Sequence, residues 1–223
     1  MAFVKKYWWK IITAMILSYV VVGGLLTPVP NLPLLNESAR NLFFHVPMWQ
    51  SMQVCFFLSA VFAIVYLKTE LNQFDLISTS FVETGFYFGL MGLSTGMLWA
   101  SGTWGKAFPN DPKIWGATLT LLAYAAYLIL RLSITNKKQV ARISAVYNIF
   151  ALALIVPALY IIPARMDGLH PGSAEDETLS ALRGQSNVFA HIFYPAMLGW
   201  VMLSLWLFDI RYRLKKLKTH EIK

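Results

Sequence analysis

The stretch AVYNIFALALIVPALYII, residues Ala145–Ile162, decides the fold, because it carries no charged side chain and is almost wholly apolar. A bilayer core of about 30 Å is crossed by roughly 20 residues of helix, so such a run is typical of a transmembrane helix. The composition agrees, with 57% hydrophobic and 13% charged residues in a chain of 223. Ordinary soluble domains carry about 25% charged residues, and this chain does not belong among them.

Six stretches of the chain are apolar enough to be predicted as membrane spans. Each has to be helical, because lipid offers no hydrogen-bond partner to an exposed backbone. We therefore predict an all-α polytopic membrane protein, a bundle of six transmembrane helices formed by a single domain over residues 1–223. The predicted spans are Ile11–Leu26, Met52–Leu67, Leu76–Ser101, Ile114–Leu130, Ala145–Ile162 and Val188–Ile210.

The lysine and arginine residues predict how this bundle is oriented. With both termini in the cytoplasm, fourteen of the 19 Lys and Arg residues lie inside, in agreement with the positive-inside rule. The net charge of +8 is thus mainly a topology signal. The topology also explains the basic tail from Arg211 to Lys223, so we do not predict that this tail binds nucleic acid. Membrane lipid is its expected neighbour.

Two histidines on the outward side of this topology are candidate haem ligands. His45 falls in the first outward connection, Thr27–Ser51, and His170 in the last, Pro163–Asn187. Two imidazoles can serve as the axial ligands of a six-coordinate haem iron. A single histidine at a membrane surface is more often a polar anchor, so the hypothesis depends on the pair. His191, at the outer start of the last span, is an alternative ligand.

A compact aromatic loop lies between these two histidines in the chain. It contains Trp104, Gly105, Phe108 and Asp111. Aromatic rings offer a flat ligand a stacking surface, and glycine lets the backbone approach it closely. Asp111 is also well placed to cap the following helix. Trp99 and Trp115, on either side of the loop, are explained as interfacial anchors. Four outward cations are candidate partners of haem propionates: Arg40, Lys113, Arg165 and Arg183.

Hydrolytic or redox catalysis is not indicated by the sequence. The single cysteine, Cys55, lies within the second span, so the chain has neither an internal disulfide nor a CxxC or CxxCH motif. Bound haem is therefore expected to be non-covalent. No nucleophile with a general base is visible, which leaves enzymatic activity open. A small transporter is a different possibility, because Glu83 is an ionisable group within the third predicted span.

Several motifs together resemble a family of haem-handling membrane proteins of cytochrome c maturation, the CcmC/CcsA family, and most closely its haem exporter protein C (CcmC) branch. The resemblance covers roughly residues 11–210. The motifs are FFHVPMW at Phe43–Trp49, TGMLWA at Thr95–Ala100, the Trp104–Asp111 loop and PAMLGW at Pro195–Trp200.

The tryptophan-rich loop matches the family only in part. The family pattern is WGxWWxWD, flanked by two outward histidines that ligate haem. Trp104, Gly105 and Asp111 match its first Trp, its Gly and its Asp. Ala107 and Asn110 stand where the family has Trp, and Phe108 replaces a third, so this loop has less aromatic surface.

The resemblance implies haem b held transiently at the periplasmic face of the bacterial inner membrane, with His45 and His170 as axial ligands. It also implies that the haem is presented to the haem chaperone CcmE, in a lyase-like transfer. CcmD and the transporter subunits CcmA and CcmB are the further partners implied. The alternative within the family is a CcsA-type synthetase, which joins haem directly to the apocytochrome and has more spans and histidines.

Overall fold

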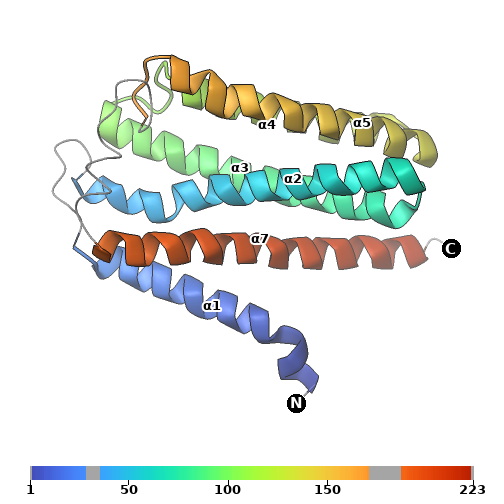
Figure 1. Cartoon of the computed structure of the whole chain (residues 1–223), viewed down its shortest axis with the longest axis horizontal. Coiled ribbons are helices and arrows are strands. Elements are labelled where there is room, and N and C mark those ends of the chain that lie inside the picture. Colours follow the sequence, from blue (N-terminus) through green and yellow to red (C-terminus); the bar gives the residue numbers. More distant parts are fainter. Residues whose placement is uncertain (1, 29–35, 171–186, 222–223) are drawn as a thin grey trace.

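The computed structural model describes residues 2–28, 36–170 and 187–221, and this part of the chain is helical apart from short connections. The prediction of an all-α polytopic membrane protein is confirmed. Most helices run along one long axis (Figure 1). In chain order the elements are α1 (Ala2–Leu26), the 3-10 helix η1 (Asn36–Phe43), α2 (His45–Thr69), α3 (Asn72–Trp104), α4 (Pro112–Ser133), α5 (Lys137–Val156), the π-helix η2 (Pro157–Ile161), the 3-10 helix η3 (Pro163–Arg165) and α7 (Asn187–Glu221).

Five helical stretches of the described chain are long and apolar enough to cross a membrane. They are Tyr7–Leu26, Glu37–Thr69, Pro112–Ser133, Lys137–Arg165 and Phe189–Lys218. The remaining predicted span, Leu76–Ser101, lies in α3, which has 33 residues but is less apolar than these five. Several of its polar side chains are turned toward the other helices, among them the buried Ser78, Ser80 and Thr84.

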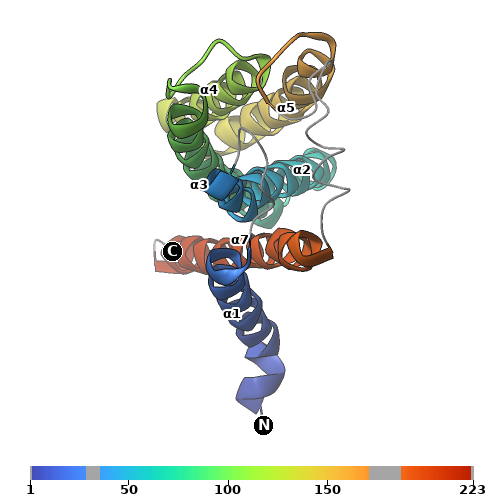
Figure 2. The same cartoon turned by 90° about the vertical axis from the view of Figure 1, so that its left-hand side faces the viewer.

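The helices form layers, with α7 between α1 and the rest of the bundle (Figures 1 and 2). α2 and α3 are an antiparallel pair that packs closely, because glycines of α3 face large side chains of α2. A Cβ added at Gly85 would lie 2.8 Å from the Phe56 ring, and one at Gly92 would lie 3.0 Å from Nε1 of Trp49. α7 contacts both α2 and α3, while α4 and α5 cover the opposite side of the pair.

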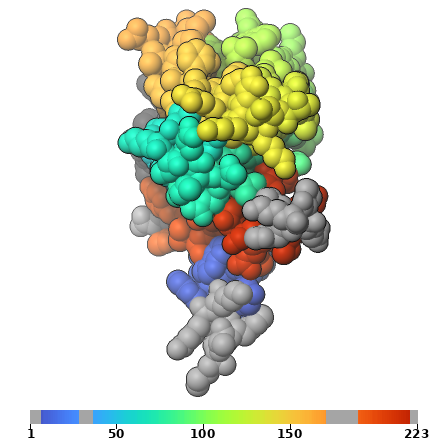
Figure 3. Space-filling view, turned by 90° about the vertical axis from the view of Figure 1, so that its right-hand side faces the viewer, coloured from blue at the N-terminus to red at the C-terminus, as the bar shows by residue number. Residues whose placement is uncertain are grey.

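Ion pairs between helices close one end of the bundle, which we call the basic end. Arg131 of α4 binds Asp75 of α3 through both guanidinium nitrogens, at 2.7 and 2.8 Å. Glu83 of α3 forms ion pairs with Arg211 and Lys215 of α7, each at 2.7 Å. Figure 3 looks onto this end, where the α2–α3 turn and the start of α5 lie beside the end of α7. Glu83, the residue behind the transporter hypothesis, therefore joins two helices.

The other end, which we call the histidine end, holds His45, Asp111 and His170. The expectation that His45 lies in a loop is wrong, because η1 and the first turn of α2 form where a loop was predicted. Pro47 permits this helix start, since the first amides of a helix have no partner within it. His45 is consequently held by a rigid element. Arg40 of η1 fastens this segment to α1, donating to the carbonyl oxygens of Gly24 and Thr27, both at 2.7 Å.

Candidate functional site

His45 is fixed between α2 and α3 by a hydrogen bond from its Nδ1 side. Nδ1 lies 2.9 Å from the carbonyl oxygen of Gly92 and 3.2 Å from Oγ1 of Thr95. The carbonyl can only accept, so Nδ1 carries the proton and donates it, and Nε2 is left as the nitrogen with a free lone pair. The ring lies against Gly96, where an added Cβ would be 2.6 Å from Cε1. The imidazole can lie here only because residue 96 of α3 is a glycine, which has no side chain.

His170 is anchored by Asp111. Its Nδ1 lies 2.9 Å from Oδ1 of Asp111, an ion-pair distance, although the contact lacks the angles of a regular hydrogen bond. Oδ2 of the same carboxylate accepts the backbone amides of Leu169 at 2.7 Å and His170 at 3.2 Å. Nδ1 therefore faces the carboxylate, and Nε2 is again the nitrogen left for a ligand.

Asp111 also performs the capping role predicted for it. Its Oδ1 accepts the amides of Lys113 and Ile114 at the start of α4, at 2.9 and 3.2 Å. Burial by itself would raise the pKa of this carboxyl, but His170 and the backbone amides outweigh burial and hold the pKa below its usual range. One ionised carboxylate thus joins the start of α4 to the segment that carries His170.

Trp99 brings the two histidines into one site. Its ring centroid lies 5.9 Å from that of His45 and 6.5 Å from that of His170. Trp104 completes the cluster, at 5.0 Å from His170 and 5.9 Å from Trp99. The imidazoles are close enough for a charge on one to be felt by the other. Two of the predicted ligands and one loop tryptophan therefore do come together.

Trp99 is the site residue that the sequence reasoning missed, since it was explained as an interfacial anchor. In fact its side chain is only 5% exposed. Its Nε1 donates to Oγ of Ser38 in η1 at 3.1 Å. The signal that identifies it is helical spacing, because Gly92, Gly96 and Trp99 recur every three or four residues on one face of α3.

Other predicted residues lie away from this cluster. The Phe108 ring packs edge-on against Trp115 at 5.1 Å. Gly105 ends α3 with a φ of 72°, a left-handed conformation that glycine adopts without strain. His191 has an exposed side chain in the first turns of α7, and Tyr19 of α1 hydrogen-bonds to its backbone.

The four candidate propionate partners have different surroundings. Arg40 binds Glu37 at 2.6 Å in addition to the end of α1. Arg165 is the exposed last residue of η3, and the backbone amide of Lys113 belongs to the Asp111 cap. Arg183 lies outside the described residues.

The donor set at the histidine end suits haem. Nδ1 of each imidazole faces an acceptor oxygen, as it commonly does in metal-binding histidines, and Nε2 of each is left to bind iron. Indole rings border them, and Gly102 on the same helix faces open space, with no atom within 4 Å of an added Cβ. Porphyrin faces pack well against such aromatic surfaces.

Fold and site together define a class, the polytopic helical membrane proteins that place a pair of histidines among tryptophans at one end of a bundle. The sequence matches the family described as "Cytochrome C assembly protein" over residues 4–170. The chain belongs to this family.

Similar proteins carry two names. The "Heme exporter protein C" of Haemophilus influenzae is 24% identical over 188 residues, which cover 82% of this chain and 73% of that protein. The "Cytochrome c biogenesis protein CcsA" of Trachelium caeruleum is 29% identical over 171 residues, covering 71% of this chain and 53% of that protein. CcsA of Cuscuta reflexa is 36% identical over 85 residues, 36% of this chain and 28% of that protein. The chain thus spans about half or less of these CcsA relatives.

Proposed function

We propose that this protein of cytochrome c biogenesis binds haem b non-covalently at its histidine end and passes it on. His45 and His170 are the axial ligands, each through Nε2. The observation that carries the proposal is that both histidines are anchored through Nδ1 while both neighbour the same indole, Trp99. Haem is the cargo of the protein, and its iron supplies the coordination bonds that hold it.

Each residue of the site has a distinct part in this proposal. The Gly92 carbonyl fixes the tautomer of His45, and the Asp111 carboxylate faces Nδ1 of His170 at ion-pair distance, which leaves Nε2 of each imidazole to bind iron. Trp104, which lies 5.0 Å from His170, offers its face to the porphyrin. No side chain here is required to form or break a covalent bond, so transfer amounts to an exchange of iron ligands.

The family and the charges support a proposed location and proposed partners. Cations gather at the basic end, which favours placing that end in the cytoplasm and the histidine end in the periplasm of a bacterial inner membrane. The haem acceptor we propose is the chaperone CcmE, with CcmD and the transporter subunits CcmA and CcmB as partners. The overlap with the Haemophilus influenzae heme exporter protein C supports this choice.

Absorption spectra test the site directly. Purified protein is compared oxidised and dithionite-reduced for wild type, His45→Ala, His170→Ala and the matched control His191→Ala. We expect a low-spin six-coordinate haem in wild type and His191→Ala, lost in the other two variants. Wild type that neither carries nor takes up haem would refute the proposal, and loss in His191→Ala would move the second ligand to α7.

A CcsA-type synthetase is the second candidate, because two of the relatives above carry that name. The recipient of the haem distinguishes the two functions. Haem-loaded protein is mixed with purified CcmE or with apocytochrome, and haem is followed into each. Transfer to CcmE supports the exporter C function, and direct attachment to apocytochrome supports the synthetase.

A further inference from the structure

The position of Trp99 conflicts with simultaneous ligation of one haem by both histidines. Two axial imidazoles approach the iron from opposite faces of the porphyrin, and both point at its centre. A ring that is near both imidazoles, as Trp99 is at 5.9 and 6.5 Å, must lie within the area of the macrocycle. Trp99 therefore has to leave at least one of these contacts before both histidines can hold the iron.

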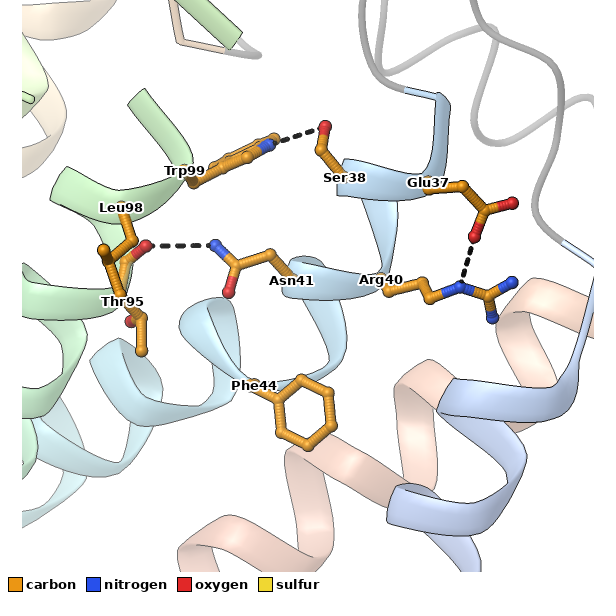
Figure 4. A pocket seen from close by; sticks show the side chains of 8 residues that line it. All are labelled: Glu37, Ser38, Arg40, Asn41, Phe44, Thr95, Leu98 and Trp99. Carbon is orange, nitrogen blue, oxygen red and sulfur yellow. Dashed lines mark hydrogen bonds and ion pairs between the residues drawn. The ribbon is translucent and has the colours of Figure 1, made fainter. Parts of the chain in front are cut away.

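A pocket beside Trp99 offers room for that movement. It has a volume of about 330 Å³, at the lower end of the range of roughly 300–1,000 Å³ for pockets that hold small organic ligands. Residues of η1 and the start of α2 face residues of α3 across it (Figure 4). The lining residues are Glu37, Ser38, Arg40, Asn41, Phe44, Thr95, Leu98 and Trp99.

The chemistry of this pocket suits an indole ring. Phe44 and Leu98 give it apolar walls, and Ser38 and Asn41 give it polar atoms able to accept the indole N–H. Trp99 already directs Nε1 toward this pocket, because it donates to Oγ of Ser38 (Figure 4). One neutral hydrogen bond is a weak restraint on a side chain.

We propose that Trp99 is a positioning residue that lies against both histidines in the free protein and turns into this pocket when haem is ligated. The inference rests on the proposed function. It assigns to the pocket a defined occupant, the Trp99 indole, and makes haem binding depend on the space between η1 and α3.

Filling the pocket tests this role. Asn41→Phe places a ring in the pocket, and Asn41→Ala is the matched control, since both variants lose the 3.3 Å hydrogen bond from Asn41 to the carbonyl of Thr95. With haemin as the probe, we expect at least tenfold weaker binding and loss of the six-coordinate spectrum in Asn41→Phe. Asn41→Ala should bind as wild type does. Adding Trp99→Ala to Asn41→Phe should restore the six-coordinate spectrum, because no indole then needs the pocket.

A second measurement follows the side chain itself. Protein labelled with 5-fluorotryptophan gives a fluorine resonance for Trp99, assigned by its absence in Trp99→Phe. Haemin should shift this resonance in wild type and in Asn41→Ala, and should leave it in place in Asn41→Phe. A cooperative thermal transition checks that Asn41→Phe folds, and Leu98→Trp fills the same pocket from its exposed side if Asn41→Phe does not.

The outcomes separate this inference from the proposed function. Wild-type haemin affinity and a wild-type spectrum in Asn41→Phe, or in Leu98→Trp where it replaces that variant, would overturn the role of Trp99 and leave the haem site intact. Failure of Trp99→Ala to restore the six-coordinate spectrum of the filled variant would do so too. A Trp99 resonance that ignores haemin in a wild type with bound six-coordinate haem would do the same. A wild type that binds no haem would overturn both.

Discussion

Gly96 and His45 form one fitted contact between α3 and α2, in which the imidazole lies where the side chain of residue 96 would be. An added Cβ would stand 2.6 Å from Cε1 of the ring. The ring is also tied to the carbonyl of Gly92, one turn earlier on α3, so it cannot retreat without breaking that hydrogen bond. The backbone of α3 therefore sets the position of the proposed ligand.

Gly96→Ala should displace His45 while both histidines remain in the chain. We expect the six-coordinate spectrum to be lost and haemin affinity to fall roughly tenfold, about 1.4 kcal/mol. Gly23→Ala in α1 is the control, because a Cβ there would lie 3.4 Å from the Ile192 side chain, an ordinary contact. Titration with haemin measures both variants, and an unchanged spectrum in Gly96→Ala would show that His45 is not held as a ligand.

Substitutions at Asp111 should separate its two roles. Asparagine caps a helix about as well as aspartate, so Asp111→Asn keeps the α4 cap but loses the charge that faces His170. Asp111→Ala loses both, at a cost of about 1 kcal/mol in the free energy of unfolding for the cap. Thermal unfolding in detergent should rank wild type above Asp111→Asn and Asp111→Ala lowest. Haem spectra should show a weakened His170 ligand in both variants, and wild-type spectra in both would contradict the anchoring role.

The pH dependence of stability should also reveal Asp111. Its folded pKa is lowered, so its charge stabilises the fold above the ordinary aspartate pKa of about 3.9, and this contribution is lost as the pH falls from there toward the folded value. The difference in melting temperature between wild type and Asp111→Asn should therefore shrink as the pH falls below about 4. A difference that grows below pH 4 would contradict this sign.

Glu83 should matter for stability and leave haem binding unchanged. Glu83→Gln leaves Arg211 and Lys215 without their shared carboxylate, and we expect a loss of about 1 kcal/mol in the free energy of unfolding. Glu70→Gln is the control, since the pair of Glu70 with Lys138 is exposed and should contribute no measurable stability. Proton- or ion-coupled transport by reconstituted wild type that disappears in Glu83→Gln would revive the transporter hypothesis.

Hydropathy was sufficient to predict the helical membrane fold, because spans such as Ala145–Ile162 are fixed by the demands of lipid on the backbone. That His45 and His170 lie at the same end of the bundle was also predictable, because alternating spans place the two connections that carry them on one side. The helical start of α2 was not predictable. The prolines of the preceding segment suggested a loop, whereas tertiary contacts make the start of α2 helical. Trp99 was missed because a tryptophan can be an interfacial anchor or a buried site residue, and residue type alone does not distinguish the two roles.

The layered order of the helices has a consequence for biosynthesis. In the described part of the chain, α1 packs against α7 and η1, and Lys10 of α1 binds Asp209 of α7 at 2.9 Å. Because α7 follows the other described helices in the chain, α1 finds this neighbour only after α7 has been synthesised and inserted. Until then α1 is bordered mostly by lipid, so the α1–α7 layer is a late step in the assembly of the described bundle.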